Sequence, residues 1–188
     1  MNILVCIKQV PDTTEIKIDP VKHTLIREGV PSIVNPFDAC ALEMAVRLKE
    51  KEGGKVIVIS MGPAQAKNAL KECLAVGADQ AFLVTDRAFG GSDTLATSYI
   101  LSRAIAAVEA KTGEKFDLIF CGKQAIDGDT AQVGPEIAEH MDLPHVTLAT
   151  AVEMADGKLH VTRDTDEGHD LVEVSLPALV TVTKTTYD

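Results

Sequence analysis

The residue types best suited to ligand binding gather in one loop, residues 121–134, between an apolar run and a helix start. Gly128 lets the backbone approach a ligand closely. The backbone N–H groups of residues 130–134 lack partners at a helix N-terminus, so phosphate oxygens can accept from them, and the helix dipole adds about 0.3–1 kcal/mol. Thr130 and Gln132 add polar side chains. This segment therefore predicts a phosphate-binding loop.

Asp127 and Asp129 complicate that loop, because carboxylates beside a phosphate repel it. They can accept hydrogen bonds from ribose hydroxyls or from an adenine amino group. They can also hold Mg²⁺ together with a nucleotide. Alternatively, Asp129 simply caps the following helix. The residues alone leave these alternatives open.

A second loop, Gly90–Thr94, is similar to the S-G-G-x-D-S/T loop of ATP pyrophosphatases. However, Phe89 stands in place of the serine, and the loop follows the third apolar run instead of the first. A flexible loop leading to a helix cap explains it equally well. The sequence contains no Walker A, G-x-G-x-x-G or G-x-S-x-G motif.

The cysteines and histidines show no pattern typical of a metal site. The histidines lack ligand spacing, and no cysteine belongs to a CxxC pair. Each cysteine is embedded in apolar sequence, as is typical of reduced core thiols. We therefore expect no metal site. The cysteines are Cys6, Cys40, Cys73 and Cys121.

These loops are placed by an alternation of strand and helix patterns over the first two-thirds of the chain. Four apolar runs are typical of strands covered on both faces, and each is followed by a helical pattern. The alternation predicts an open, mostly parallel twisted sheet with helices on both faces, which binds ligands beyond the carboxyl ends of its strands. The runs are Ile3–Val10, Val56–Ile59, Ala81–Val84 and Leu118–Cys121.

Local signals predict where the helices begin and end. Asn35 followed by Pro36 indicates a helix start, and Gly53–Gly54 indicates its end. Ser92 or Asp93 is expected to cap a later helix. The expected inner faces are Ala41, Met44, Ala45 and Leu48, then Ala66, Leu70, Cys73 and Leu74, then Leu101, Ala104, Ile105 and Val108. A last helix is expected near Val133–Met141, and a small hairpin over Ile16–Pro20 and His23–Arg27.

From His145 the pattern changes to short strand-like runs. Asp156–Gly157 and Gly168 are turn residues between some of them. We expect these runs to extend the sheet with antiparallel strands near the C-terminus. The runs are Val146–Val152, Leu159–Arg163, Leu171–Val174 and Leu179–Val182.

Length and composition fit a single domain spanning residues 1–188. The formal net charge of −10 disfavours binding to a phosphate backbone, so nucleic acid is not an expected partner. No apolar run reaches transmembrane length. The N-terminus starts directly as a buried strand without the basic region of a signal peptide, so the cytoplasm is the expected compartment.

Several motifs together resemble the β subunit of electron-transfer flavoproteins, over the whole length of the chain. The resemblance implies a fold shared with the universal stress and adenine-nucleotide α-hydrolase-like proteins. It also implies an electron carrier that works with an α subunit, not an enzyme, so no catalytic residue is expected. The motifs are Cys6–Asp12, Asn35–Asp38, Ser60–Ala64, Ala75–Asp79 and Cys121–Thr130.

The resemblance further implies where a nucleotide binds. Cys6 and the Asn35–Asp38 turn would line the adenosine pocket with Met61 nearby, and Ala125–Glu136 would surround the phosphates. The expected cofactor-binding residues are Cys6, Lys8, Asn35, Pro36, Phe37, Asp38, Met61, Gly62, Gly122, Ala125, Ile126, Asp127, Gly128, Asp129, Thr130, Ala131, Gln132, Val133, Gly134 and Glu136.

The ligand differs between two branches of this family. In one branch the β subunit holds AMP, and in the other it carries an FAD that takes hydride from NADH and bifurcates the electrons. Phe89–Ser98 and Gly128–Gly134 resemble the bifurcating branch, so FAD is favoured over AMP. The implied partners are the α subunit, an acyl-CoA dehydrogenase or similar flavoenzyme, and NAD.

One departure concerns the end of the chain. Family members continue past Thr183–Asp188 into an arm that packs on the α subunit, so the resemblance implies that this arm is missing here. A universal-stress-like nucleotide-binding module is the second hypothesis, although its late glycine-rich phosphate loop is not found. An ATP pyrophosphatase using Gly90–Thr94 is the third.

Overall fold

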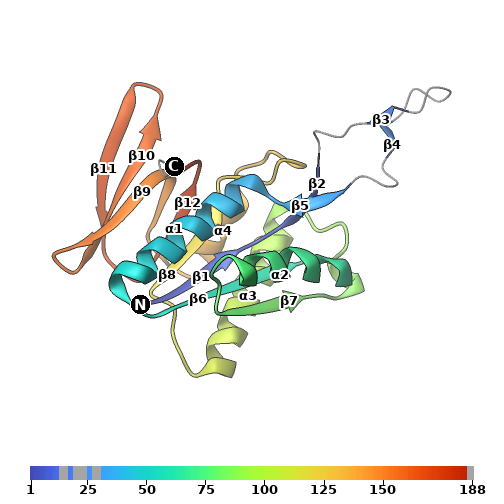
Figure 1. Cartoon of the computed structure of the whole chain (residues 1–188), viewed down its shortest axis with the longest axis horizontal. Helices are drawn as coiled ribbons and strands as arrows, with labels where there is room; N and C mark the ends of the chain where they lie inside the picture. The colour runs from blue at the N-terminus through green and yellow to red at the C-terminus, as the bar shows by residue number, and fades with distance from the viewer. Residues whose placement is uncertain (13–16, 19–24, 27–30, 186–188) are drawn as a thin grey trace.

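The structure, a computed structural model, describes residues 1–12, 17–18, 25–26 and 31–185. The strands of its large sheet are β1 (Asn2–Cys6), β6 (Lys55–Met61), β7 (Gln80–Val84), β8 (Leu118–Gly122), β9 (His145–Ala155), β10 (Lys158–Thr165), β11 (Gly168–Val174) and β12 (Ala178–Val182). Within the described part their order is β11-β10-β9-β12-β8-β1-β6-β7 (Figure 1). The predicted α/β class is confirmed.

Helices cover both faces of the parallel half of this sheet. They are α1 (Pro36–Glu52), α2 (Lys67–Ala75), α3 (Thr94–Thr112) and α4 (Val133–His140), with short 3₁₀ helices η2 (Ala64–Ala66) and η3 (Arg87–Phe89). Ile3 and Val5 of β1 pack in the apolar cluster that contains α1 and α2. Leu4 and Cys6, which point to the opposite face, pack with α3 and α4. The continuous apolar runs are therefore explained, because each strand buries both of its faces.

The helix ends lie close to where the local signals placed them. α1 has Asn35 at its N-cap and Gly53 at its C-cap. Asp93, not Ser92, caps α3, since its Oδ1 accepts from the Ala96 N–H at 2.8 Å. The expectation for Leu74 is wrong, because this side chain is 42% exposed. β7 is the last strand of the sheet, so no further strand covers the final turn of α2.

The C-terminal strands extend the sheet, with one difference from the expectation. β9, β10 and β11 pair antiparallel, and the β9–β10 turn contains Asp156 and Gly157 at positive φ. β12, however, is inserted between β8 and β9 and runs parallel to both. All five of its residues are buried, as expected for a strand in the interior of a parallel sheet.

The expected first strand is interrupted after Cys6. The chain leaves the sheet and forms β2 (Gln9–Pro11), which pairs antiparallel with β5 (Ser32–Val34) in a ribbon that extends away from β1 (Figure 1). Beyond it, β3 (Lys17–Ile18) pairs with β4 (Leu25–Ile26). The rest of the predicted small hairpin lies outside the described residues.

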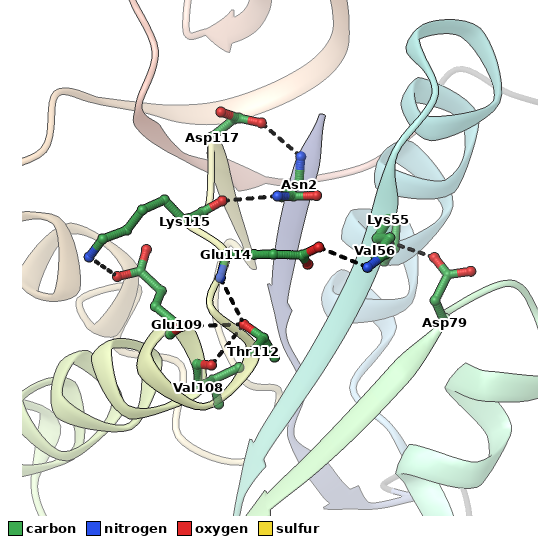
Figure 2. A network of polar contacts seen from close by, with 10 residues as sticks. All are labelled: Asn2, Lys55, Val56, Asp79, Val108, Glu109, Thr112, Glu114, Lys115 and Asp117. Atoms are coloured by element: carbon green, nitrogen blue, oxygen red, sulfur yellow. Dashed lines mark hydrogen bonds and ion pairs between the residues drawn. The ribbon is translucent and has the colours of Figure 1, made fainter.

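The amino ends of the strands are held together by polar contacts (Figure 2). The backbone N–H of Asn2 donates to Asp117 at 2.7 Å, and its side-chain amide donates to the Lys115 carbonyl at 3.2 Å. Lys55 pairs with Glu114 at 2.9 Å. These contacts join the amino ends of the strands to the segments that precede β8.

Among the described residues, none of the helices has the length and apolar character needed to cross a bilayer.

Candidate functional site

A cavity of about 1180 Å³ lies at the opposite edge, beyond the carboxyl ends of β1, β6, β7 and β8. This is where a parallel sheet is expected to bind its ligand. The lining comes from the loops that follow these strands and from the first residues of α3 and α4. It comprises residues 6–8, 61–64, 85–87, 89–94, 121–125 and 128–134, together with Asp38, Thr97 and Leu101.

The loop between β8 and α4 is shaped by its two carboxylates. Asp127 accepts two hydrogen bonds from the Lys8 ammonium, at 2.7 and 3.0 Å. Asp129 accepts from the Gln124 side-chain amide at 2.7 Å and has φ +52°. The helix-cap alternative for Asp129 is therefore wrong. The N-cap of α4 is Gln132, without a side-chain capping bond. Both carboxylates hold the loop through partners within the chain.

The backbone at the start of α4 leaves donors available to a ligand. Within the described part of the chain, the N–H groups of residues 130–134 donate no hydrogen bond to another residue. Residues 128–134 line the cavity, so a ligand in it can meet these donors. A row of free N–H groups at a helix N-terminus suits a phosphate. The sequence-based prediction of a phosphate-binding loop therefore has a matching geometry.

Two residues at the start of α1 tie this loop to the end of β1. The carboxylate of Asp38 accepts from the Lys8 N–H at 2.7 Å and from the Gly122 N–H at 3.1 Å. The Asn35 side chain donates to the Gln124 carbonyl at 2.8 Å and accepts from the Ile126 N–H at 3.1 Å. Lys8 and Gly122 follow neighbouring strands, so these contacts fix one wall of the cavity.

Burial dominates the electrostatics of Asp38, which is 7% exposed. Desolvation raises its pKa from 3.8 to about 7. Hydrogen bonds from the Lys8 backbone, the Asn35 side chain and the Gly122 backbone act in the opposite direction but do not cancel the effect. The cavity therefore has a wall whose charge changes near neutral pH.

Two buried thiols form the floor of the cavity. Cys6 and Cys121 are register partners on β1 and β8, and both line the cavity. A hydrogen bond that the Cys121 thiol donates to Cys6, together with burial, raises the pKa of Cys121 well above its ordinary value. A protonated, buried thiol is a weak nucleophile, so Cys121 is suited to packing against a ligand.

The structure gathers most of the expected site residues but not all. Asn35 and Asp127 do not line the cavity but hydrogen-bond residues of the loops that form it. Glu136 accepts from the Thr94 hydroxyl at 3.1 Å and so links α4 to α3. The expected residues that line the cavity are Cys6, Lys8, Asp38, Met61, Gly62, Gly122, Ala125, Gly128, Asp129, Thr130, Ala131, Gln132, Val133 and Gly134. Those outside the lining are Asn35, Pro36, Phe37, Ile126, Asp127 and Glu136.

The expected set omitted the wall built by the β7–α3 loop. Residues 85–87 and 89–94 line the cavity. The sequence places this loop at a carboxyl strand end and predicts a helix cap or a pyrophosphatase-like motif there. Its resemblance to the bifurcating branch, over Phe89–Ser98, is the signal that points to a cofactor. The Thr94 hydroxyl lies 3.3 Å from the Gln132 side-chain oxygen, so this wall meets the phosphate-type loop directly.

Fold and cavity together define an α/β domain of the class that binds nucleotides at the carboxyl edge of a parallel sheet. The model of the electron transfer flavoprotein domain matches residues 22–188. The chain therefore belongs to the electron transfer flavoprotein family, as the sequence motifs indicated.

Curated relatives agree with this family. The electron transfer flavoprotein subunit beta of Thermoanaerobacterium thermosaccharolyticum is 59% identical over 98% of this chain and 68% of its own length. The caffeyl-CoA reductase-Etf complex subunit CarD of Acetobacterium woodii is 54% identical over 98% of this chain and 69% of its own. Protein FixA of Azotobacter vinelandii is 52% identical, over 97% and 65%.

Membership of this family decides between the classes that the sequence left open. The chain is a β-type electron-carrier subunit, associated with flavin and paired with an α subunit, and not an enzyme in its own right. The universal-stress and ATP-pyrophosphatase hypotheses are not supported. The loop Gly90–Thr94, which suggested the latter, follows β7 and forms a wall of the cavity.

Proposed function

We propose that the cavity binds FAD, with the diphosphate on the free N–H groups of residues 130–134 and the adenosine toward Cys6 and Met61. The observation that carries this proposal is the run of backbone N–H groups at residues 130–134, which have no partner among the described residues and belong to a segment that lines a large cavity. Its volume of about 1180 Å³ lies above the range of roughly 300–1,000 Å³ for small-ligand sites. A dinucleotide fits that size better than AMP.

Both signs of charge occur in the lining, and its carboxylates have partners within the chain. The cations Lys8, Arg87 and Lys123 line the cavity, and the carboxylates, each of which accepts a hydrogen bond from within the chain, are Asp38, Asp86, Asp93 and Asp129. Asp127 and Asp129 of the loop after β8 would repel a phosphate. The Lys8 ammonium at Asp127 and the Gln124 side-chain amide at Asp129 reduce this repulsion. The flavin supplies the electron chemistry, and this chain binds and orients it.

The proposed role of residues 1–188 is that of one nucleotide-binding unit within a heterodimer. The caffeyl-CoA reductase-Etf complex named for one relative supports a bifurcating role, in which NADH reduces the flavin and a flavoenzyme such as an acyl-CoA dehydrogenase exchanges electrons with the heterodimer. The β7–α3 loop supports FAD as the ligand, because its residues extend the lining of the cavity beyond the proposed phosphate loop.

The test is to identify the nucleotide that the protein holds. The chain is purified with its α subunit and denatured, and the released nucleotides are separated by chromatography and measured by absorbance. Two FAD per heterodimer support the proposal. One FAD with one AMP keeps the cavity but makes its ligand AMP, and the absence of any adenine nucleotide beyond the α-subunit flavin overturns the assignment of the cavity.

A further inference from the structure

Asn35 shows an unusual use of a helix N-cap. An asparagine at this position ordinarily accepts a hydrogen bond from a backbone N–H of the first helical turn. In α1 the side chain of Asn35 makes no capping bond. The first turn is held by the backbone instead, since the Asn35 carbonyl accepts from the N–H groups of Asp38 and Ala39 at 2.9 and 3.0 Å.

The side chain spans to the loop that follows β8, about 90 residues further along the chain. Its amide nitrogen donates to the Gln124 carbonyl at 2.8 Å, and its amide oxygen accepts from the Ile126 N–H at 3.1 Å. One partner is an acceptor and the other a donor, which matches an amide and not a carboxylate or an aliphatic group. Asn35 is 1% exposed, so an unmet partner would be costly.

The backbone of Asn35 is fixed as well. Its N–H donates to the Lys8 carbonyl at 2.9 Å, immediately after β1. The loop segment that it holds ends in the turn from Ala125 to Asp129, where the N–H of Asp129 donates to Ala125 at 2.9 Å. The N–H groups of residues 130–134, which have no partner in the described part of the chain, follow directly. The position of these donors therefore depends on where Asn35 holds the preceding turn.

We propose that Asn35 is a positioning residue for phosphate recognition, which acts through residues 124–126 and makes no contact with the nucleotide. This inference rests on the proposed function of the cavity. Within the Asn35–Asp38 turn, Asp38 lines the cavity, whereas Asn35, whose side chain also hydrogen-bonds Asp38, does not. The loop proposed for the phosphate is thereby positioned by a residue that lies about 90 residues earlier in the sequence.

The experiment compares Asn35→Ala with wild type in the complex of the full chain and its α subunit, stripped of nucleotide. Titration calorimetry with FAD, AMP and adenosine is the measurement. Loss of Asn35 should weaken FAD and AMP by about tenfold or more, the loss expected from two hydrogen bonds. Adenosine, which lacks phosphate, should lose less affinity than AMP, because the contacts of Asn35 with Gln124 and Ile126 hold the loop proposed for the phosphate.

Asn2→Ala is the matched control. Its side chain also donates to a loop carbonyl, that of Lys115 at 3.2 Å, but at the amino end of β1 and away from the cavity. It should leave all three affinities unchanged. Equal losses for AMP and adenosine in Asn35→Ala, or no loss for either, overturn the positioning role. A wild-type complex that binds none of the three ligands overturns the proposed function instead.

A second measurement needs no variant and decides the case if Asn35→Ala does not fold or adenosine binds too weakly to titrate. In the nucleotide-free wild type, hydrogen exchange of the Ile126 amide should be slow although the residue lies in a loop, because its N–H donates a hydrogen bond to Asn35. Exchange at the rate of an unprotected loop amide would contradict the proposal.

Discussion

Gly122 and Asp38 lie so close that no other residue fits at position 122. The Gly122 N–H donates to Oδ1 of Asp38 at 3.1 Å, and a Cβ on residue 122 would lie 2.2 Å from that same oxygen. The backbone of residues 37 and 38 is also within 2.7 Å of such a Cβ. The N-terminus of α1 and the end of β8 are thus in contact through backbone atoms, and this contact closes one side of the cavity.

Substituting Gly122 should therefore destabilise the chain. In Gly122→Ala, α1 has to move away from β8, and we expect a loss of about 1–3 kcal/mol in the free energy of unfolding, as for an overpacked core. Urea unfolding measures it. Gly128→Ala is the control, since no atom lies within 4 Å of the added Cβ. Equal stabilities of the two variants would show that the contact can relax freely.

Asp38 should make stability depend on pH. Its pKa is raised from 3.8 to about 7 by burial, so the folded chain holds this proton more tightly than the unfolded chain. The free energy of unfolding should fall as the pH rises from about 4 to about 7, by up to about 1.4 kcal/mol per unit, and stay level above. Urea unfolding of wild type and Asp38→Asn across this range isolates the effect as a difference. A difference that does not vary with pH would contradict the raised pKa.

The Lys8–Asp127 pair should affect nucleotide affinity more than stability. Both side chains are partly exposed, at 49% and 32%, so the pair contributes about 0–1 kcal/mol to folding. Lys8→Met removes a cation from the cavity and should weaken FAD binding, whereas Asp127→Asn removes a competing anion and should strengthen it. Affinities measured at low and high salt test this, because the effect of Lys8→Met should shrink at high salt.

Lys158→Met is the matched control for this pair. Lys158 pairs with Glu173 on the β10–β11 hairpin, where the exposed fractions are 47% and 48%, and neither residue lines the cavity. It should leave FAD affinity unchanged. If Lys8→Met and Lys158→Met weaken binding equally, the effect comes from net charge and not from the position of Lys8.

The four cysteines should differ in their reactivity toward alkylating reagents. Cys40 is half-buried and should react first, while burial raises the pKa of Cys73 to about 12 and keeps it slow. Cys6 and Cys121 line the cavity, so FAD should slow their alkylation further without changing the rate at Cys73. Alkylation followed by peptide mass spectrometry gives the rate at each site. Protection of Cys73 to the same extent would indicate general stabilisation of the fold.

Local patterns in the sequence were enough for most elements and for the phosphate-type loop. Continuous apolar runs predict strands buried on both faces, and Asn35–Pro36 and Gly53 mark the ends of α1, because caps and burial act over a few neighbouring residues. The loop after β8 could be selected because parallel strands bring their carboxyl ends to one edge.

Only the tertiary structure decided how distant segments meet. β12 lies parallel between β8 and β9, a placement that its apolar sequence allows but does not specify. Asp129 turns to Gln124 instead of capping α4, and Leu74 is exposed because the sheet ends at β7. Asn35 holds a loop some 90 residues away. Propensity and periodicity are properties of neighbours along the chain, whereas these four outcomes depend on which partners the packed sheet brings within hydrogen-bonding distance or leaves in contact with water.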